Sequence, residues 1–152
     1  MIREATENDF DEWLRMRVLL YPERDSQRLL SEIKTIFTRR TILGELDYHI
    51  LVHEEERNKL SGFIETSIRK QLQGYQTSPV GYIESLYVVP INRRNGIARQ
   101  LVAFSEKWIR SQNCNQFFVD TDPGYLDAIQ FYKSVGFKEV GSNEKEIIFK
   151  KG

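Results

Sequence analysis

The chain has 152 residues, of which 40% are hydrophobic and 29% charged, and its 22 Lys and Arg balance its 22 Asp and Glu. This composition predicts one globular domain over residues 1–152, and the balanced charge argues against nucleic acid or an anionic membrane as a partner. The single cysteine, Cys114, excludes an internal disulfide framework, and the absence of a long apolar run or a signal-like amino terminus predicts a cytoplasmic protein.

The first forty residues predict a short strand at 2–5 followed by two helices. The first helix should end near Tyr21, because the residue before a proline is pushed out of the helical conformation. A second helix is expected after Asp25, with an apolar stripe that includes Leu29 and Phe37. The apolar positions that predict the first helix are Phe10, Trp13, Leu14 and Val18.

The rest of the chain alternates between strand and helix patterns. Two strands at 48–54 and 60–68 predict a hairpin whose charged turn is 55–59. The following segments are expected in order: an apolar strand at 82–89, a helix at 96–111 carrying Ile97, Leu101, Phe104 and Trp108, a strand at 116–120, a helix at 125–135, and short strands at 138–140 and 146–150.

This order predicts a mixed α/β fold, with a central sheet of about six to seven strands flanked by about four helices. The strand at 82–89, the helix at 96–111 and the strand at 116–120 follow one another directly. They therefore predict a parallel βαβ unit at the centre of the sheet.

A short basic connection, Arg93-Arg94-Asn95-Gly96-Ile97-Ala98-Arg99, joins the apolar strand to the helix. Gly96 and Ala98 allow an anion to approach the backbone, and the first amides of the helix lack partners within it. The helix dipole and three arginines add positive charge at the same place. The connection predicts a pyrophosphate-binding turn; the alternative is an ordinary strand-to-helix turn with a solvated basic loop.

Two segments of the chain resemble the GNAT family of N-acetyltransferases. One is this turn, and the other is Ala128 to Phe137, which is similar to the family pattern Ala-x-x-x-Tyr-x-x-x-Gly-Phe. The resemblance implies the GNAT fold, bound acetyl-CoA with its pyrophosphate on the turn, and a backbone amide near Val88 that meets the thioester oxygen. The implied cofactor-binding residues are Leu86, Tyr87, Val88, Arg93, Arg94, Asn95, Gly96, Ile97, Ala98 and Arg99. The chain departs from the pattern at Tyr125, where many members carry an Asn that reaches the pantetheine arm.

Acetyl transfer to an amine needs a proton acceptor for the amine and a proton donor for the sulfur. Glu84 interrupts the apolar strand 82–89, where a carboxylate is costly unless it is paired or wet, and is the candidate acceptor. The alternative for Glu84 is an outward-facing or structural charge. Asp120 lies at the carboxyl end of the strand 116–120, where α/β sheets place ligands, and is the candidate for holding a cationic substrate. Tyr132, which the resemblance places near the sulfur, is the candidate general acid; the alternative is a tyrosine packed in the core.

A closer resemblance, over nearly the whole chain, is to the chromosomal type of aminoglycoside 6′-N-acetyltransferases. It implies acetylation of the 6′-amine of these polycationic antibiotics and a homodimer. Tyr21 and Tyr75 are candidates for stacking on sugar rings, although Tyr21 stands where Trp is expected and Gln76 where an acid is expected. The segments that carry the resemblance are Phe10-Asp11-Glu12-Trp13-Leu14, Leu20-Tyr21-Pro22, Ser67-Ile68-Arg69, Thr77-Ser78-Pro79-Val80, Ile83-Glu84 and Asp120-Thr121.

Two other functions stay open at this point. The acceptor can be another small-molecule amine, such as a polyamine, an amino-acid derivative or a peptide amine, or the domain can bind acetyl-CoA without turnover. No metal site is expected, because His49 and His53 share one strand pattern with no third ligand nearby.

Overall fold

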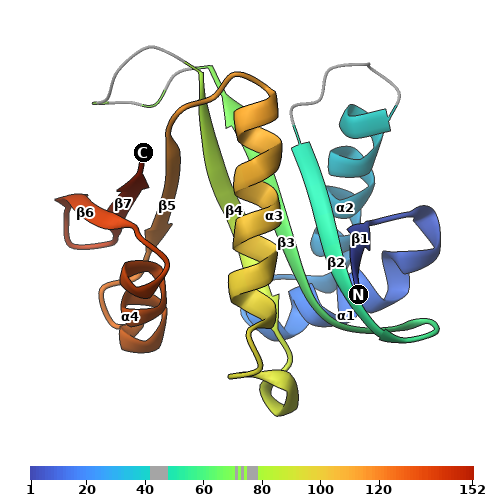
Figure 1. Cartoon of the computed structure of the whole chain (residues 1–152). Coiled ribbons are helices and arrows are strands. Elements are labelled where there is room, and N and C mark those ends of the chain that lie inside the picture. Colours follow the sequence, from blue (N-terminus) through green and yellow to red (C-terminus); the bar gives the residue numbers. More distant parts are fainter. Residues whose placement is uncertain (42–47, 71, 73, 75–78) are drawn as a thin grey trace.

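The computed structural model describes residues 1–41, 48–70, 72, 74 and 79–152, which form a seven-stranded sheet with helices on both faces (Figure 1). The observed order of strands and helices matches the predicted order, and the mixed α/β fold is confirmed. The elements are β1 (Ile2–Glu4), α1 (Phe10–Leu20), α2 (Ser26–Thr41), β2 (Tyr48–Glu56), β3 (Lys59–Arg69), β4 (Val80–Val88), α3 (Ile97–Ser111), β5 (Phe117–Thr121), α4 (Leu126–Ser134), β6 (Lys138–Ser142) and β7 (Ile147–Lys151), with short 3-10 turns at Glu7–Asp9 and Pro90–Asn92.

The strands lie in the order β1-β2-β3-β4-β5-β7-β6, and the pair β4–β5 is parallel while the others are antiparallel. Helix α3 crosses one face of the sheet over β2, β3 and β4, while α1 and α2 cover the other face (Figure 1). The predicted parallel centre, β4-α3-β5, is therefore present.

The hairpin between β2 and β3 is tighter than the predicted turn at 55–59. Strand β2 continues to Glu56, so Arg57 and Asn58 alone form the turn. Asn58 has a φ of 63°, and Asn tolerates this left-handed conformation better than other residues with side chains.

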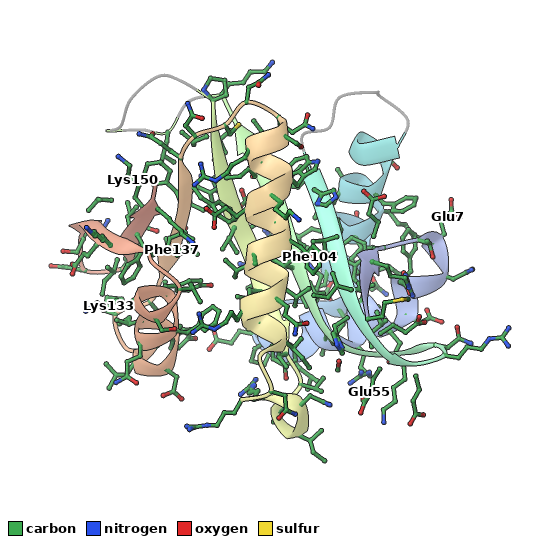
Figure 2. All side chains as sticks on the ribbon, viewed as in Figure 1. Glu7, Glu55, Phe104, Lys133, Phe137 and Lys150 are labelled. Atoms are coloured by element: carbon green, nitrogen blue, oxygen red, sulfur yellow. The ribbon has the colours of Figure 1, made fainter. Side chains whose placement is uncertain are left out.

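The core forms on both faces of the sheet. Two residues predicted to lie on the apolar stripes of their helices, Phe104 and Val18, are instead exposed. Phe104 is 48% exposed on α3 (Figure 2), because the buried stripe is centred on Ser105 and a one-residue step turns a side chain by about 100°. Val18 is 36% exposed on α1, whereas its neighbour Arg17 is buried with Glu65 of β3. Apolar spacing alone did not reveal that an arginine occupies the inner face of α1.

Strands β4 and β5 are joined only where Gly81–Ile83 pairs with residues 117–119. On the other edge of β4, Ile83 lies opposite Thr66 and Ser85 lies opposite Glu65, so Glu84 is an extra residue without a β3 partner in the ladder. Such a β-bulge bends the strand and changes the direction in which its side chains point. Contacts of Glu84 with Ser67, and of Ser85 with Tyr21, show where these two neighbours point: toward the face that carries α1.

Gly81, the first residue of this parallel pairing, allows α3 to approach β4 closely. A Cβ at position 81 would lie 2.7 Å from both Cδ1 and Cγ2 of Ile109. We expect Gly81→Ala to lower the free energy of unfolding by about 1–3 kcal/mol through overpacking, measured by urea denaturation. Adding Ile109→Val removes one of the clashing atoms and should recover part of that loss; no recovery would contradict a local clash.

Among the residues that the structure describes, no helix is long and apolar enough to cross a membrane.

Candidate active site

A cleft of about 1080 Å³ opens beside the carboxyl-terminal half of β4, where the β4–β5 ladder has ended. Its walls come from the end of α1 (Leu19 and Leu20), the end of β4, the basic turn, the first turn of α3, and helix α4 with the residues just before it. The predicted cofactor-binding residues that line it are Leu86, Tyr87, Val88, Arg93, Arg94, Gly96, Ile97, Ala98 and Arg99; Asn95 does not.

The amino terminus of α3 faces this cleft through Gly96, which precedes the helix with a φ of 79°. Arg94 in the same turn also has a positive φ, 66°. The turn thus presents the free amides of the first helical residues to the cleft. Backbone amides, a helix dipole and flanking arginines together form a site suited to a diphosphate.

The three arginines of the turn have different surroundings. Arg93 donates from Nε to the Val88 carbonyl at 2.7 Å, and its guanidinium lies 5.3 Å from the centre of the Tyr87 ring. Arg93 therefore fixes the turn to the end of β4. Arg94 and Arg99 are exposed at the cleft, and Arg99 reaches Ser134 of α4 at 3.5 Å. Positive charge therefore lies on both sides of the helix terminus.

Gly96 offers a direct test of anion binding at this turn. We expect Gly96→Val to weaken acetyl-CoA binding by at least about tenfold, because a β-branched residue is strained at this φ and its side chain would stand at the helix terminus. Isothermal titration calorimetry measures this change. Gly74→Val is a matched control, since Gly74 has a φ of 82°, equally open surroundings and no place in the cleft lining. Equal losses in both variants would count against the turn.

Tyr132 of α4 projects into the same cleft and is only 7% exposed. Its ring packs edge-on against Phe131 and Phe137, whose ring centres lie 5.3 and 5.7 Å away. Burial raises the pKa of Tyr132, and the negative charge of Asp120 raises it further. The hydroxyl is therefore protonated at neutral pH and is available as a donor.

Glu84 does not border this cleft, and its carboxylate is paired within the protein. Oε2 accepts hydrogen bonds from Ser67 Oγ at 2.6 Å and from Arg69 Nε at 3.0 Å. Oε1 accepts one from Arg69 Nη2 at 2.9 Å. The bulge thus places Glu84 against the end of β3, where Arg69 holds it through a bidentate pair that leaves lone pairs on Oε1.

Asp120 of β5 lies in the same group of polar side chains. It accepts a hydrogen bond from the hydroxyl of Tyr82, which is buried between Arg69 and Asp120. The Arg69 guanidinium lies 3.6 Å from the centre of the Tyr82 ring. Burial and the hydrogen bond to Asp120 raise the pKa of Tyr82, so the tyrosine remains the donor. We call Arg69, Glu84, Tyr82 and Asp120 the acceptor cluster.

Tyr21 connects the end of α1 to the bulge. Its hydroxyl lies 2.5 Å from Ser85 Oγ and donates to the Glu84 carbonyl at 3.4 Å. Burial raises the pKa of Tyr21. Arg24 stacks on its ring at 4.0 Å, which leaves less of the ring free for a sugar than the sequence suggested. The other predicted stacking residue, Tyr75, lies outside the described residues.

The predicted residues therefore fall into two groups. Apart from Asn95, the residues of the turn line the cleft together with Tyr132, while Glu84, Asp120 and Tyr21 lie outside its walls. The charge of Asp120 raises the pKa of Tyr132, so the two groups interact electrostatically. Ser67, Arg69, Tyr82 and Ser85 were not predicted as site residues. Within the described residues, no cluster of His, Cys, Asp and Glu has the composition of a metal site.

Residues 10–137 match the model of a protein family described as the acetyltransferase (GNAT) family. The matched region contains the bulge, the turn, α3 and Tyr132, so the family covers both groups of residues.

Several curated relatives match almost the whole chain. The aminoglycoside N(6′)-acetyltransferase type 1 of Acinetobacter haemolyticus is 29% identical over 151 residues, which cover 99% of this chain and 97% of that protein. The protein of the same name from Acinetobacter genomosp. 13 is 31% identical with the same coverage. Among solved structures, the aminoglycoside antibiotic 6′-N-acetyltransferase of Acinetobacter haemolyticus superposes with a TM-score of 0.82 at 28% identity, covering 94% of each chain.

Proposed function

The chain belongs to the acetyltransferase (GNAT) family, and from this we propose that it transfers the acetyl group of acetyl-CoA to the 6′-amine of aminoglycoside antibiotics. The observation that supports this substrate most directly is the full-length similarity to proteins named for that reaction. The acceptor cluster adds a physical argument, because Glu84 and Asp120 can attract a cationic amine.

The residues of the cleft fit acetyl-CoA as a cosubstrate. Arg94, Gly96 and Arg99 would hold the diphosphate at the amino terminus of α3, and Arg93 keeps the turn in place. The backbone of β4 beyond Ile83 no longer pairs with β5 and would receive the pantetheine arm. Leu86 and Val88 contribute apolar surface beside it. When bound, acetyl-CoA supplies an activated acetyl thioester.

We propose that the acceptor approaches from the face of the sheet opposite α3. An alkyl amine is a cation at neutral pH and must lose a proton before it can attack a carbonyl carbon. Glu84 Oε1 is proposed to take this proton, directly or through a water molecule, since it accepts only one of the three hydrogen bonds made to that carboxylate. Asp120 would hold the amine beside it, and Tyr132 would donate to the departing sulfur.

The decisive experiment measures CoA thiol release by the purified protein with acetyl-CoA and two classes of aminoglycoside. We expect release with compounds that carry a 6′-amine and none with close analogues that carry a 6′-hydroxyl. Release with polyamines or peptide amines but with no aminoglycoside would retain the acetyltransferase and replace the substrate. Acetyl-CoA binding without thiol release for any amine would instead favour a binding module.

A homodimer and a cytoplasmic location belong to the same proposal. Light scattering of the purified protein and fractionation of expressing cells test them directly.

A further inference from the structure

The carboxylates of the acceptor cluster are already partnered by groups of the protein itself. Glu84 receives a bidentate pair from Arg69 and a hydrogen bond from Ser67. Asp120 receives a hydrogen bond from the neutral Tyr82 hydroxyl. Arg69 is thus the one positive charge within this cluster, and it stands where a substrate ammonium group would otherwise neutralise Glu84.

Arg69 is held in this position by contacts on several sides. Its guanidinium donates twice to Glu84 and stacks on Tyr82 at 3.6 Å. Its side chain is 37% exposed and that of Glu84 is 26% exposed, so the pair is partly accessible at the end of β3. A substrate arriving at Asp120 therefore meets Arg69 beside it.

The cluster therefore contains two carboxylates and one guanidinium, which leaves one net negative formal charge. Without Arg69, an incoming cation would face two carboxylates with no positive charge beside them. Each additional ammonium group on the ligand would then be attracted more strongly than it is when Arg69 is present. With Arg69 present, a single ammonium at Asp120 is matched, while further ammonium groups near Glu84 meet a like charge.

We propose that Arg69 is a specificity-determining residue that limits how strongly the acceptor site prefers polycationic amines over amines with a single charge. The inference rests on the proposed function, because it concerns the acceptor of that same reaction. Arg69 acts as a built-in counter-cation for Glu84, and Asp120 is the carboxylate left to bind the substrate ammonium.

The test measures equilibrium binding of two amines to the protein saturated with CoA. Kanamycin A is the polycation, and 6-amino-6-deoxyglucose is an amine of single charge with the corresponding 6-amino group. In Arg69→Gln we expect the ratio of their affinities to shift toward kanamycin A by about tenfold at low salt. This shift should shrink at high salt, because screening weakens attraction between exposed charges. Arg69→Lys retains the charge and should stay near the wild-type ratio.

Two further variants separate charge from structural damage. Arg110→Gln breaks an Arg–Glu pair of similar length on α3, away from the cluster, and should leave the ratio unchanged. Glu84→Gln leaves the Arg69 charge unopposed and should shift the ratio away from kanamycin A, which tests the proposal even if Arg69→Gln folds poorly.

An unchanged ratio in Arg69→Gln, or equal shifts in Arg69→Gln and Arg69→Lys, would overturn the proposal and assign Arg69 a purely geometric role. Because binding rather than turnover is measured, the ratio can be obtained whether or not either amine is acetylated, provided that both bind. Loss of the proposed function would appear separately, as absent thiol release by the wild-type protein. If neither the wild-type protein nor Arg69→Gln binds kanamycin A, the proposal also fails.

Discussion

Replacing Tyr132 with phenylalanine is expected to lower the rate of acetyl transfer by about 10²-fold, the lower end of the range for loss of a general acid or base. The hydroxyl is held protonated by burial and by the charge of Asp120, so it can donate to the sulfur as the carbon–sulfur bond breaks. The ring contacts with Phe131 and Phe137 remain in the variant. Acetyl-CoA affinity and the thermal midpoint should therefore change little. Single-turnover kinetics measures the chemical step.

Tyr125→Phe provides the matched control for this experiment. Tyr125 lines the same cleft but is 63% exposed, and the same hydroxyl group is removed. We expect its rate to remain within about twofold of the wild type, since an exposed hydroxyl is readily replaced by water. A normal rate in Tyr132→Phe would mean that water protonates the sulfur and that Tyr132 serves only in packing.

Replacing Arg17 with methionine should have the largest effect on stability. Arg17 donates to both oxygens of Glu65, at 2.8 and 3.3 Å, and both side chains are at most 5% exposed. The same guanidinium bonds Glu32 and the Leu29 carbonyl of α2. Without it, Glu65 would remain buried with the Trp13 indole N–H as its donor. Removing one partner of a buried ion pair costs about 3–5 kcal/mol, which urea denaturation would detect as a lower free energy of unfolding.

Arg15→Met is the control on the same helix. Arg15 pairs with Glu12 at 2.7 Å, but its side chain is 44% exposed, so we expect a loss of about 1 kcal/mol or less. Combining Arg17→Met with Glu65→Leu should restore part of the stability, because no buried charge is then left unpaired. Equal losses for Arg15→Met and Arg17→Met would show that burial of the pair is not what matters.

The order of the elements and the position of the basic turn at the start of α3 could be predicted because their signals are local. Periodicity operates over a few residues, and the turn places its glycine, alanine and arginines within one contiguous stretch. The acceptor cluster could not be assembled this way. Arg69 and Glu84 are 15 residues apart, and Tyr82 and Asp120 are 38 apart, so their contacts depend on strand pairing.

Two details of β3 and β4 explain the remaining differences. Glu65 lies in the buried part of β3, and apolar spacing on α1 could not identify Arg17 as its partner. The bulge at Glu84 adds one residue to β4, and simple alternation gives no sign of such a shift. Without the bulge, Glu84 and Ser85 would have been expected on opposite faces.

The same bulge separates two tasks along a single strand. Residues before it carry the acceptor cluster on one face, while residues after it border the cleft beside α3. If the proposed roles hold, we expect mutations at positions 69, 82 or 84 to alter the choice of amine without disturbing the turn at residues 93–99, which is proposed to bind the diphosphate. New acceptors can thus be selected, in nature or in directed evolution, on a donor site that stays constant.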